Sequence, residues 1–173
     1  MRTYRSDGVP EACLSLQDDH TVDVNMLLYC CWCGERVGPF DDALFDAAVA
    51  FSESWFENVV VKLRDARRWM KQDGCHTAPI EEEPCLRLRE KIKQVEFAAE
   101  KLQEEALESL LSNRPSTEAV VADVVAGAVS NLARYFGHIG QPVSDDVQTK
   151  LAVIVCAAFP DADGEVVARA LRT

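Results

Sequence analysis

The sequence predicts an all-α fold, a helical bundle of about six or seven helices. Apolar residues recur with the period of a helix through nearly the whole chain, and no stretch of five or more residues alternates as a strand does. The 8 glycines and 7 prolines fall mostly between these periodic segments, where they end one helix and precede the next. The 173 residues, 48% hydrophobic and 27% charged, have a globular composition. We therefore expect a single helical domain over residues 1–173.

Four helices are expected before residue 75. Pro10 suits the first turn of the first helix, where the N–H that proline lacks would have no partner. The second helix is apolar around most of its circumference, which indicates a buried, central position, and Gly34 is its expected C-terminal cap. The last two helices meet at Ser52, a residue type that caps helices, or run on as one bent helix. The expected bounds are 9–20, 23–33, 41–51 and 52–72.

The longest helix is expected over residues 84–111, after three glutamates that complement the helix dipole. Its apolar residues form a stripe with nearly heptad spacing, as in a coiled coil. The stripe predicts either an intramolecular hairpin or a dimeric coiled coil, and its length leaves both open, so a homodimer through this helix is one expectation. The stripe consists of Leu88, Ile92, Val95, Ala99, Leu102, Ala106 and Leu110.

Three further helices are expected in residues 116–172. The first, over about 117–136, is rich in alanine and valine and contains Gly127, so it allows close packing with a neighbouring helix. Ser144 and Asp163 are the expected N-terminal caps of the other two. Those helices should span residues 145–159 and 164–172.

Charge and hydropathy exclude several classes of protein. With 29 acidic and 18 basic side chains the net charge is −11, which argues against nucleic-acid binding, because that affinity comes mostly from neutralised phosphates. The longest apolar run, Leu151–Phe159, has nine residues and is too short to span a membrane. The N-terminus has no apolar signal region. We therefore expect a cytoplasmic protein whose seven cysteines are reduced.

The strongest local signal is a cluster of basic residues near the end of the helix over 52–72. On a regular helix Arg67 lies at the edge of the apolar face, where an arginine usually has a carboxylate partner. Candidate partners are Asp18, Asp19 and Asp23. The cluster is therefore either a site for an anion or a protein partner, or a set of internal ion pairs. The site residues would be Arg64, Arg67, Arg68 and Lys71, with all but Arg67 pointing outward.

A cysteine cluster gives a weaker signal. Cys30 and Cys33 lie one helical turn apart, and a tetrahedral zinc site would need two further ligands. Cys75 and His76 could supply them, with Cys85 in reserve. The simpler interpretation is a set of buried thiols in an apolar helix, so we expect neither a metal nor another cofactor.

The aromatic residues are concentrated in one region. Eight of the 13 lie between residues 29 and 69, where they form either a packed core or the wall of an apolar pocket that includes Trp32, Trp55 and Trp69. No catalytic triad spacing and no phosphate-binding glycine loop occurs. Catalysis is therefore not expected.

The N-terminal half resembles a known family. The matching residues are Gly8, Ala12-Cys13-Leu14, Leu16-Gln17-Asp18, Val24-Asn25, Leu27-Leu28, Gly34, Trp55, Val59-Val60, Leu63-Arg64, Ala66-Arg67-Arg68 and Lys71. Over residues 8–72 they are similar to a proteobacterial family of about this length, described only as a domain of unknown function. The resemblance implies an all-helical fold and no particular activity.

These observations favour a non-catalytic interaction or regulatory protein that binds a protein partner. The alternative is a helical binder of a small apolar or amphipathic carboxylate, with an arginine as counter-ion. A zinc-binding protein or enzyme is the third possibility.

Overall fold

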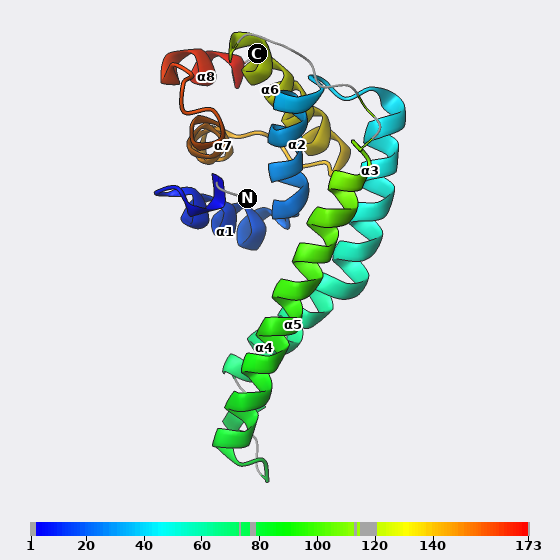
Figure 1. Cartoon of the computed structure of the whole chain (residues 1–173). Coiled ribbons are helices and arrows are strands. Elements are labelled where there is room, and N and C mark those ends of the chain that lie inside the picture. Colours follow the sequence, from blue (N-terminus) through cyan, green and yellow to red (C-terminus); the bar gives the residue numbers. More distant parts are fainter. Residues whose placement is uncertain (1–2, 73, 77–78, 113, 115–120, 173) are drawn as a thin grey trace. The chain divides into compact units, whose positions relative to one another are not determined.

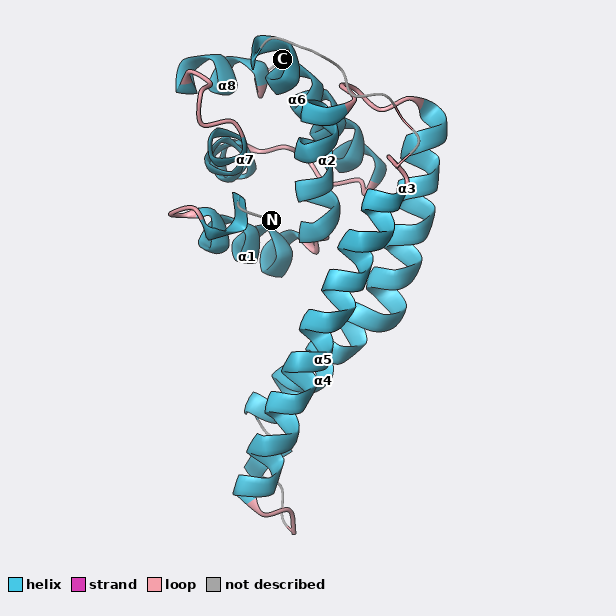
Figure 2. Ribbon diagram, viewed as in Figure 1, coloured by secondary structure: helices cyan, strands magenta, loops and turns pink. Residues whose placement is uncertain are grey.

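The computed structural model describes residues 3–72, 74–76, 79–112, 114 and 121–172, and within these residues all regular structure is helical (Figures 1 and 2). Counting α3, the π-helical turn η2 and α4 as one continuous helix, these residues form seven helices besides two short 3-10 turns. This confirms the predicted all-α class. The elements are η1 (Thr3–Arg5), α1 (Val9–His20), α2 (Val24–Arg36), α3 (Asp42–Trp55), η2 (Phe56–Val60), α4 (Val61–Gln72), η3 (Gly74–His76), α5 (Glu82–Ser109), α6 (Val121–His138), α7 (Asp145–Ala158) and α8 (Gly164–Ala170).

The chain forms two compact units: unit 1 comprises residues 1–45 and 113–173, and unit 2 comprises residues 46–112. In unit 1, α2 packs along α6, α1 packs on α7, and α8 contacts both α6 and α7. The side chains between these helices are fully buried, among them Leu16, Leu27, Leu132 and Ile154. Their burial supplies the main stabilisation of the unit.

The contact between α2 and α6 depends on Gly34. A Cβ atom at this position would lie 2.6 Å from the Cα and 2.7 Å from the Cβ of Ala128, so only glycine allows the two helices to come this close. The prediction that Gly34 caps α2 was therefore wrong, because the helix continues to Arg36. Gly38 instead takes the left-handed conformation that ends helices, with φ of 82°.

A buried asparagine on α6 secures the turn that follows α2. The Asn131 side chain accepts a hydrogen bond from the Phe40 N–H at 2.7 Å and donates to the carbonyls of Cys30 and Gly38, each at 3.2 Å. The backbone groups of this turn are thereby paired inside the protein. The predicted caps of the last two helices are confirmed: Ser144 accepts from the Val147 N–H and Asp163 from the Glu165 N–H.

Unit 2 is a helical hairpin in which the continuous helix of α3, η2 and α4 runs beside α5 (Figure 1). Two polar contacts fix the helices against each other. The indole N–H of Trp55 donates to the Ala99 carbonyl at 3.0 Å, and the Gln103 amide donates to the Ser52 hydroxyl at 2.8 Å. Ser52 is thus a buried residue within a continuous helix rather than a cap.

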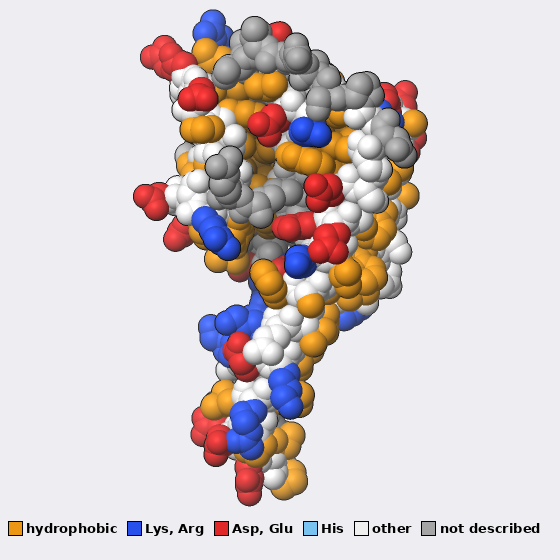
Figure 3. Space-filling view, viewed as in Figure 1, with side chains coloured by type: hydrophobic (Ala, Val, Ile, Leu, Met, Phe, Trp, Pro, Cys, Tyr) orange, Lys and Arg blue, Asp and Glu red, His pale blue; other side chains and the backbone are white. Residues whose placement is uncertain are grey.

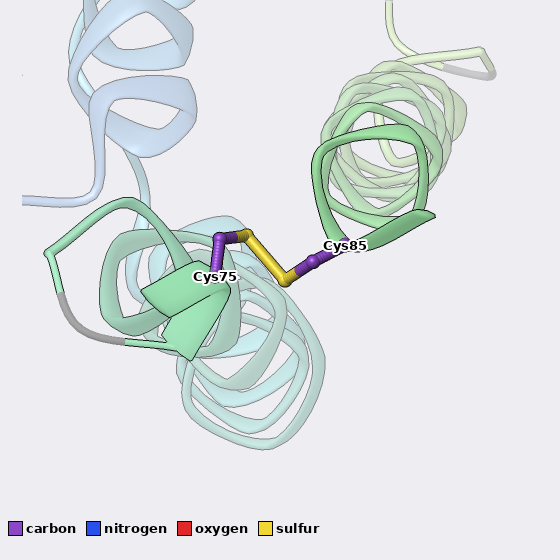
Figure 4. The surroundings of a disulfide bond; sticks show 2 residues. All are labelled: Cys75 and Cys85. Atoms are coloured by element: carbon purple, nitrogen blue, oxygen red, sulfur yellow. A yellow bond between two sulfur atoms is a disulfide. The ribbon is translucent and has the colours of Figure 1, made fainter. Parts of the chain in front are cut away.

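The tip of the hairpin holds a disulfide bond between Cys75 of η3 and Cys85 in the first turn of α5 (Figure 4). Both cysteines are buried with Met70, and Ile92 packs against them. The bond contradicts the expectation that all seven cysteines are reduced. Its signal in the sequence is the short separation of the two cysteines across a turn, which brings them close once the hairpin forms.

The π turn changes the direction in which α4 presents its side chains. The Val61 N–H bonds to the Phe56 carbonyl five residues before it, so this turn holds one residue more than an α-helical turn would. An extra residue rotates everything after it by about 100°. Phe56, Val60 and Arg64 are consequently buried, whereas Ala66 is exposed.

Candidate interaction surface

Four charged side chains form ion pairs between the two helices of the hairpin. Arg64 Nε lies 3.3 Å from Glu96 Oε1, and Arg64 Nη2 lies 2.9 Å from Glu100 Oε1. Arg67 binds the same Glu96 carboxylate through Nε and through Nη2, the latter at 2.9 Å. The side chains of Arg64 and Glu96 are each only 8% exposed. This Arg64–Glu96 network is therefore part of the interior of unit 2.

The electrostatics of Glu96 follow from these contacts. Burial by itself raises the pKa of the carboxyl group, because it disfavours the charged form. The hydrogen bond and charge of Arg67, together with Arg64, outweigh burial and hold the pKa below its usual value. Glu96 is thus the ionised centre of the network.

Two of the four residues of the predicted basic site, Arg64 and Arg67, belong to this network. The sequence predicted that Arg64 points outward and Arg67 lies at a boundary, but Arg64 is buried and Arg67 is partly buried. That error has a physical cause, since the sequence was projected on a regular helix and the π turn rotates α4. The carboxylate partner of Arg67 is Glu96, and not Asp18, Asp19 or Asp23, which the sequence suggested.

The other two basic residues of the predicted site lie differently. Arg68 is half-buried and Lys71 is exposed. Arg64 and Arg67 thus have their charges balanced inside the hairpin, so these four residues do not form one uniform basic surface.

A different surface of the hairpin is apolar. Leu88, Val95 and Leu102 of α5 are 52%, 53% and 54% exposed, although the predicted stripe placed them in a packed seam. The buried residues of α5 are instead Cys85, Glu96, Ala99, Gln103 and Leu107. Ala99 and Gln103 bond to α3 and Glu96 to α4, so these residues form the true seam with the first helix of the hairpin. Their centre lies about 60° around the helix from the centre of the predicted stripe. Leu88, Val95 and Leu102 form a line on one side of that seam, which we call the α5 edge.

The true seam was not predicted because two of its members, Glu96 and Gln103, are polar. Their seven-residue spacing, equal to that of the apolar residues, was the available signal. Hydrophobic side chains reach the surface along the hairpin among basic and acidic ones (Figure 3). In the described part of the chain, most of the exposed large hydrophobic side chains belong to unit 2: Trp69, Ile80, Leu86, Leu88, Val95, Phe97 and Leu102.

The three tryptophans of the predicted pocket have different surroundings. Trp32 lines a cavity of about 560 Å³ in unit 1, together with Leu28 and Phe159. Trp55 packs within the hairpin and bonds to Ala99. Trp69 is 54% exposed and covers Gly74, where a Cβ atom would lie 2.6 Å from the indole Cε3.

The four buried free cysteines of unit 1 are poor nucleophiles and poor metal ligands. Burial raises the pKa of Cys13, Cys31 and Cys33 to about 12 and that of Cys30 well above its usual value, and only a thiolate is reactive. Among the described residues no three histidine, cysteine or acidic side chains are grouped as metal ligands. Of the proposed zinc ligands, Cys75 is bonded to Cys85, and the His76 side chain lies outside the described residues.

The sequence also matches a known family. Residues 1–107 match the family described as "Protein of unknown function (DUF2390)". The chain belongs to this family. The match covers more than half of the chain and extends beyond residues 8–72, over which the resemblance was noted from the sequence. It includes the hairpin through Leu107 of α5, and the family description names no activity.

Neither a curated protein nor a solved structure matches the chain. Within the described residues, no helix is both long enough and apolar enough to cross a membrane. The function must therefore be argued from the surfaces and cavities of this family member itself.

Proposed function

We propose that this family member is a non-catalytic interaction protein that binds a protein partner through the α5 edge. One observation carries the proposal: Leu88, Val95 and Leu102 are each more than half exposed and lie in a line on one side of α5. Exposed apolar residues gathered on one element are typical of interaction sites, whereas scattered ones need no explanation. The cytoplasm remains the proposed compartment.

The hairpin has the rigidity that such a surface requires. The Arg64–Glu96 network, the Trp55–Ala99 hydrogen bond and the Ser52–Gln103 hydrogen bond hold α5 on the continuous helix formed by α3, η2 and α4. A disulfide closes the tip. An edge that is fixed before binding loses little conformational freedom when a partner docks, and this favours affinity.

Site-specific photo-cross-linking tests this proposal. A photoreactive phenylalanine analogue replaces Val95 in the protein expressed in its native host, and the same analogue replaces Glu90, which is exposed and lies on the opposite side of α5. We expect defined adducts from position 95 and none from position 90. Equal labelling at both positions, or no adduct from a folded position-95 variant, would contradict the proposal.

A cavity in unit 1 supports a second candidate function, the binding of a small amphipathic carboxylate. It has a volume of about 630 Å³, within the range of ligand sites. Its wall combines apolar side chains from α7, from α8 and from the residues after α8 with two charged residues, Asp145 and Arg172, of which Arg172 is the counter-ion that such a ligand needs. The lining residues include Ala152, Val153, Cys156, Ala168, Leu171 and Arg172.

Titration with decanoate followed by native mass spectrometry tests this second candidate. We expect one decanoate per chain and weaker binding in Arg172→Gln, with Arg36→Gln as the control outside the cavity. Binding that is unchanged in Arg172→Gln would remove the support for this site.

A further inference from the structure

We propose that the α5 edge binds the same edge of a second copy of this chain, in antiparallel orientation, about a two-fold axis at Val95. This inference rests on the proposed function, because it names the partner that the edge takes. It goes beyond that function by fixing the geometry of the contact.

The spacing of the edge makes it self-complementary. Leu88 and Leu102 each lie seven residues from Val95, two helical turns or about 10.5 Å along the axis. A two-fold axis through Val95 therefore places Val95 against Val95 and Leu88 against Leu102 of the second copy. Seven-residue spacing of apolar residues is what keeps two helices in contact over several turns.

The charges along α5 select the antiparallel orientation. Glu96 and Glu100 bind Arg64 inside the hairpin, so only the exposed charges beside the edge count: Arg87 and Lys91 before Val95 are basic, and Glu105 after it is acidic. The sign thus changes at the same residue that centres the apolar edge. Antiparallel copies bring the basic half of each helix to the acidic half of the other. Parallel copies would place like charges together, which is unfavourable.

The exposure of these charged residues fits such a contact. Arg87 and Lys91 are exposed before Val95 and Glu105 is exposed after it, all on the solvent side of the edge. A two-fold axis at Val95 places each residue before Val95 opposite the residue equally far after it in the second copy. Arg87 lies about as far before Val95 as Glu105 lies after it, so Arg87 comes near Glu105 of the second copy. Charge pairs at the rim of an interface set its orientation and make association depend on salt. We therefore expect a dimer that depends on both concentration and salt.

Cysteine cross-linking of the purified full-length protein tests the geometry. The background is Cys156→Ser, because Cys156 is half-buried while the other free cysteines of the described residues are buried. Under mild oxidation Val95→Cys should link to itself. Leu88→Cys should link to Leu102→Cys when two differently tagged chains are mixed, but not to itself. Glu90→Cys, on the opposite side of α5, is the control and should stay unlinked.

Sedimentation equilibrium over a wide concentration range supplies the second measurement. Wild type should form a dimer that raised salt weakens, and Val95→Lys should be a monomer with an unchanged circular dichroism spectrum. Self-linking of Leu88→Cys, or Val95→Lys that dimerises as wild type does, would overturn the proposed geometry. A wild type that is monomeric at every concentration would overturn the proposed partner.

The two proposals fail in different ways. If the purified protein is monomeric while the probe at Val95 captures a different protein in the native host, the self-association is wrong and the interaction function stands. If the probe captures nothing and the purified protein is monomeric, both are wrong. An adduct of twice the chain mass in the native host, together with the expected cysteine pattern, supports both.

Discussion

At the level of single residues, the buried carboxylate Glu96 determines how the hairpin is held together. It neutralises Arg64 and Arg67 in a setting where an unpaired charge is strongly disfavoured. Replacing Glu96 with Gln should lower the free energy of unfolding by about 3 kcal/mol, because two arginines lose their shared counter-charge. Urea unfolding at neutral pH measures this change.

The matched control is Glu83→Gln. Glu83 forms an ion pair with Arg87 on α5, but the two side chains are 84% and 61% exposed, and such surface pairs contribute about 0.5 kcal/mol or less. An equal effect of both substitutions would show that Glu96 does not act through its burial.

The pH dependence of stability follows from the same carboxylate. Its pKa is lowered in the folded protein, so the folded state binds a proton less readily than the unfolded chain. The stabilisation by ionised Glu96 is therefore present above the unfolded pKa of about 4.3 and is lost as the pH falls through the folded pKa. The stability difference between wild type and Glu96→Gln should shrink on acidification. A difference that stays constant from neutral to strongly acidic pH would contradict the assignment.

Gly34 allows a residue-level test in unit 1. Gly34→Ala would place a methyl group against the backbone of Ala128, and overpacking of this kind costs about 1–3 kcal/mol. Gly137→Ala, in the last turns of α6, meets no atom within 4 Å and should be neutral or stabilising by up to about 1 kcal/mol. Thermal melts of the two variants should thus shift in opposite directions or by clearly unequal amounts.

At the level of elements, the sequence predicted where helices occur better than which way they face. The first helix was predicted over its actual range, Val9–His20, because Pro10 marks its start and the apolar period continues to its end. The orientation of α4 was wrong because the π turn adds a residue without any marker in composition. The seam of α5 was misplaced because its polar members pair with the other arm of the hairpin, Glu96 with α4 and Gln103 with α3, and the sequence did not show that pairing.

The π turn can be tested by shortening it. Asn58 is an exposed residue within η2, and its deletion should convert the turn to regular α-helix. The residues after it would then rotate by about 100°, which separates Arg64 and Arg67 from Glu96. We expect a loss of several kcal/mol, measured by urea unfolding. Asn58→Ala removes only the hydrogen bond to the Ser54 carbonyl and should cost about 1 kcal/mol or less.

The disulfide at the tip of the hairpin determines how many cysteine thiols can react before reduction. Protein denatured without reductant should expose five reactive thiols, Cys13, Cys30, Cys31, Cys33 and Cys156, and reduction should add two. Replacing Cys75 and Cys85 together with Ser should lower the stability of the oxidised protein by about 2–4 kcal/mol. Seven reactive thiols before reduction would show that Cys75 and Cys85 are not bonded in the isolated protein.

At the level of the whole molecule, composition and periodicity were sufficient to predict the fold class, because the helical period of apolar residues recurs in every segment of an all-α chain. The candidate surface was not predictable in the same way. Whether Leu88, Val95 and Leu102 are buried or exposed depends on which side of a continuous apolar stripe packs on α4, and that choice is made by Arg64 and Glu96, which lie 32 residues apart in the sequence.

One helix belongs to both units, which bears on whether the chain unfolds as the single domain that the sequence predicts. α3 begins at Asp42, in unit 1, and continues without a break through η2 and α4 into unit 2. Leu44 and Phe45, in its first turn, are buried, so unfolding of this helix would remove side chains from the core of unit 1 as well. If the chain unfolds as one domain, Glu96→Gln should accelerate amide hydrogen exchange by the same factor in the slowest peptides of α2 and of α5, because both exchange through global opening. Exchange followed by peptide mass spectrometry measures this, with Glu83→Gln as the control that changes neither. Acceleration confined to residues 46–112 would show that the two units unfold separately and that the single-domain prediction is wrong.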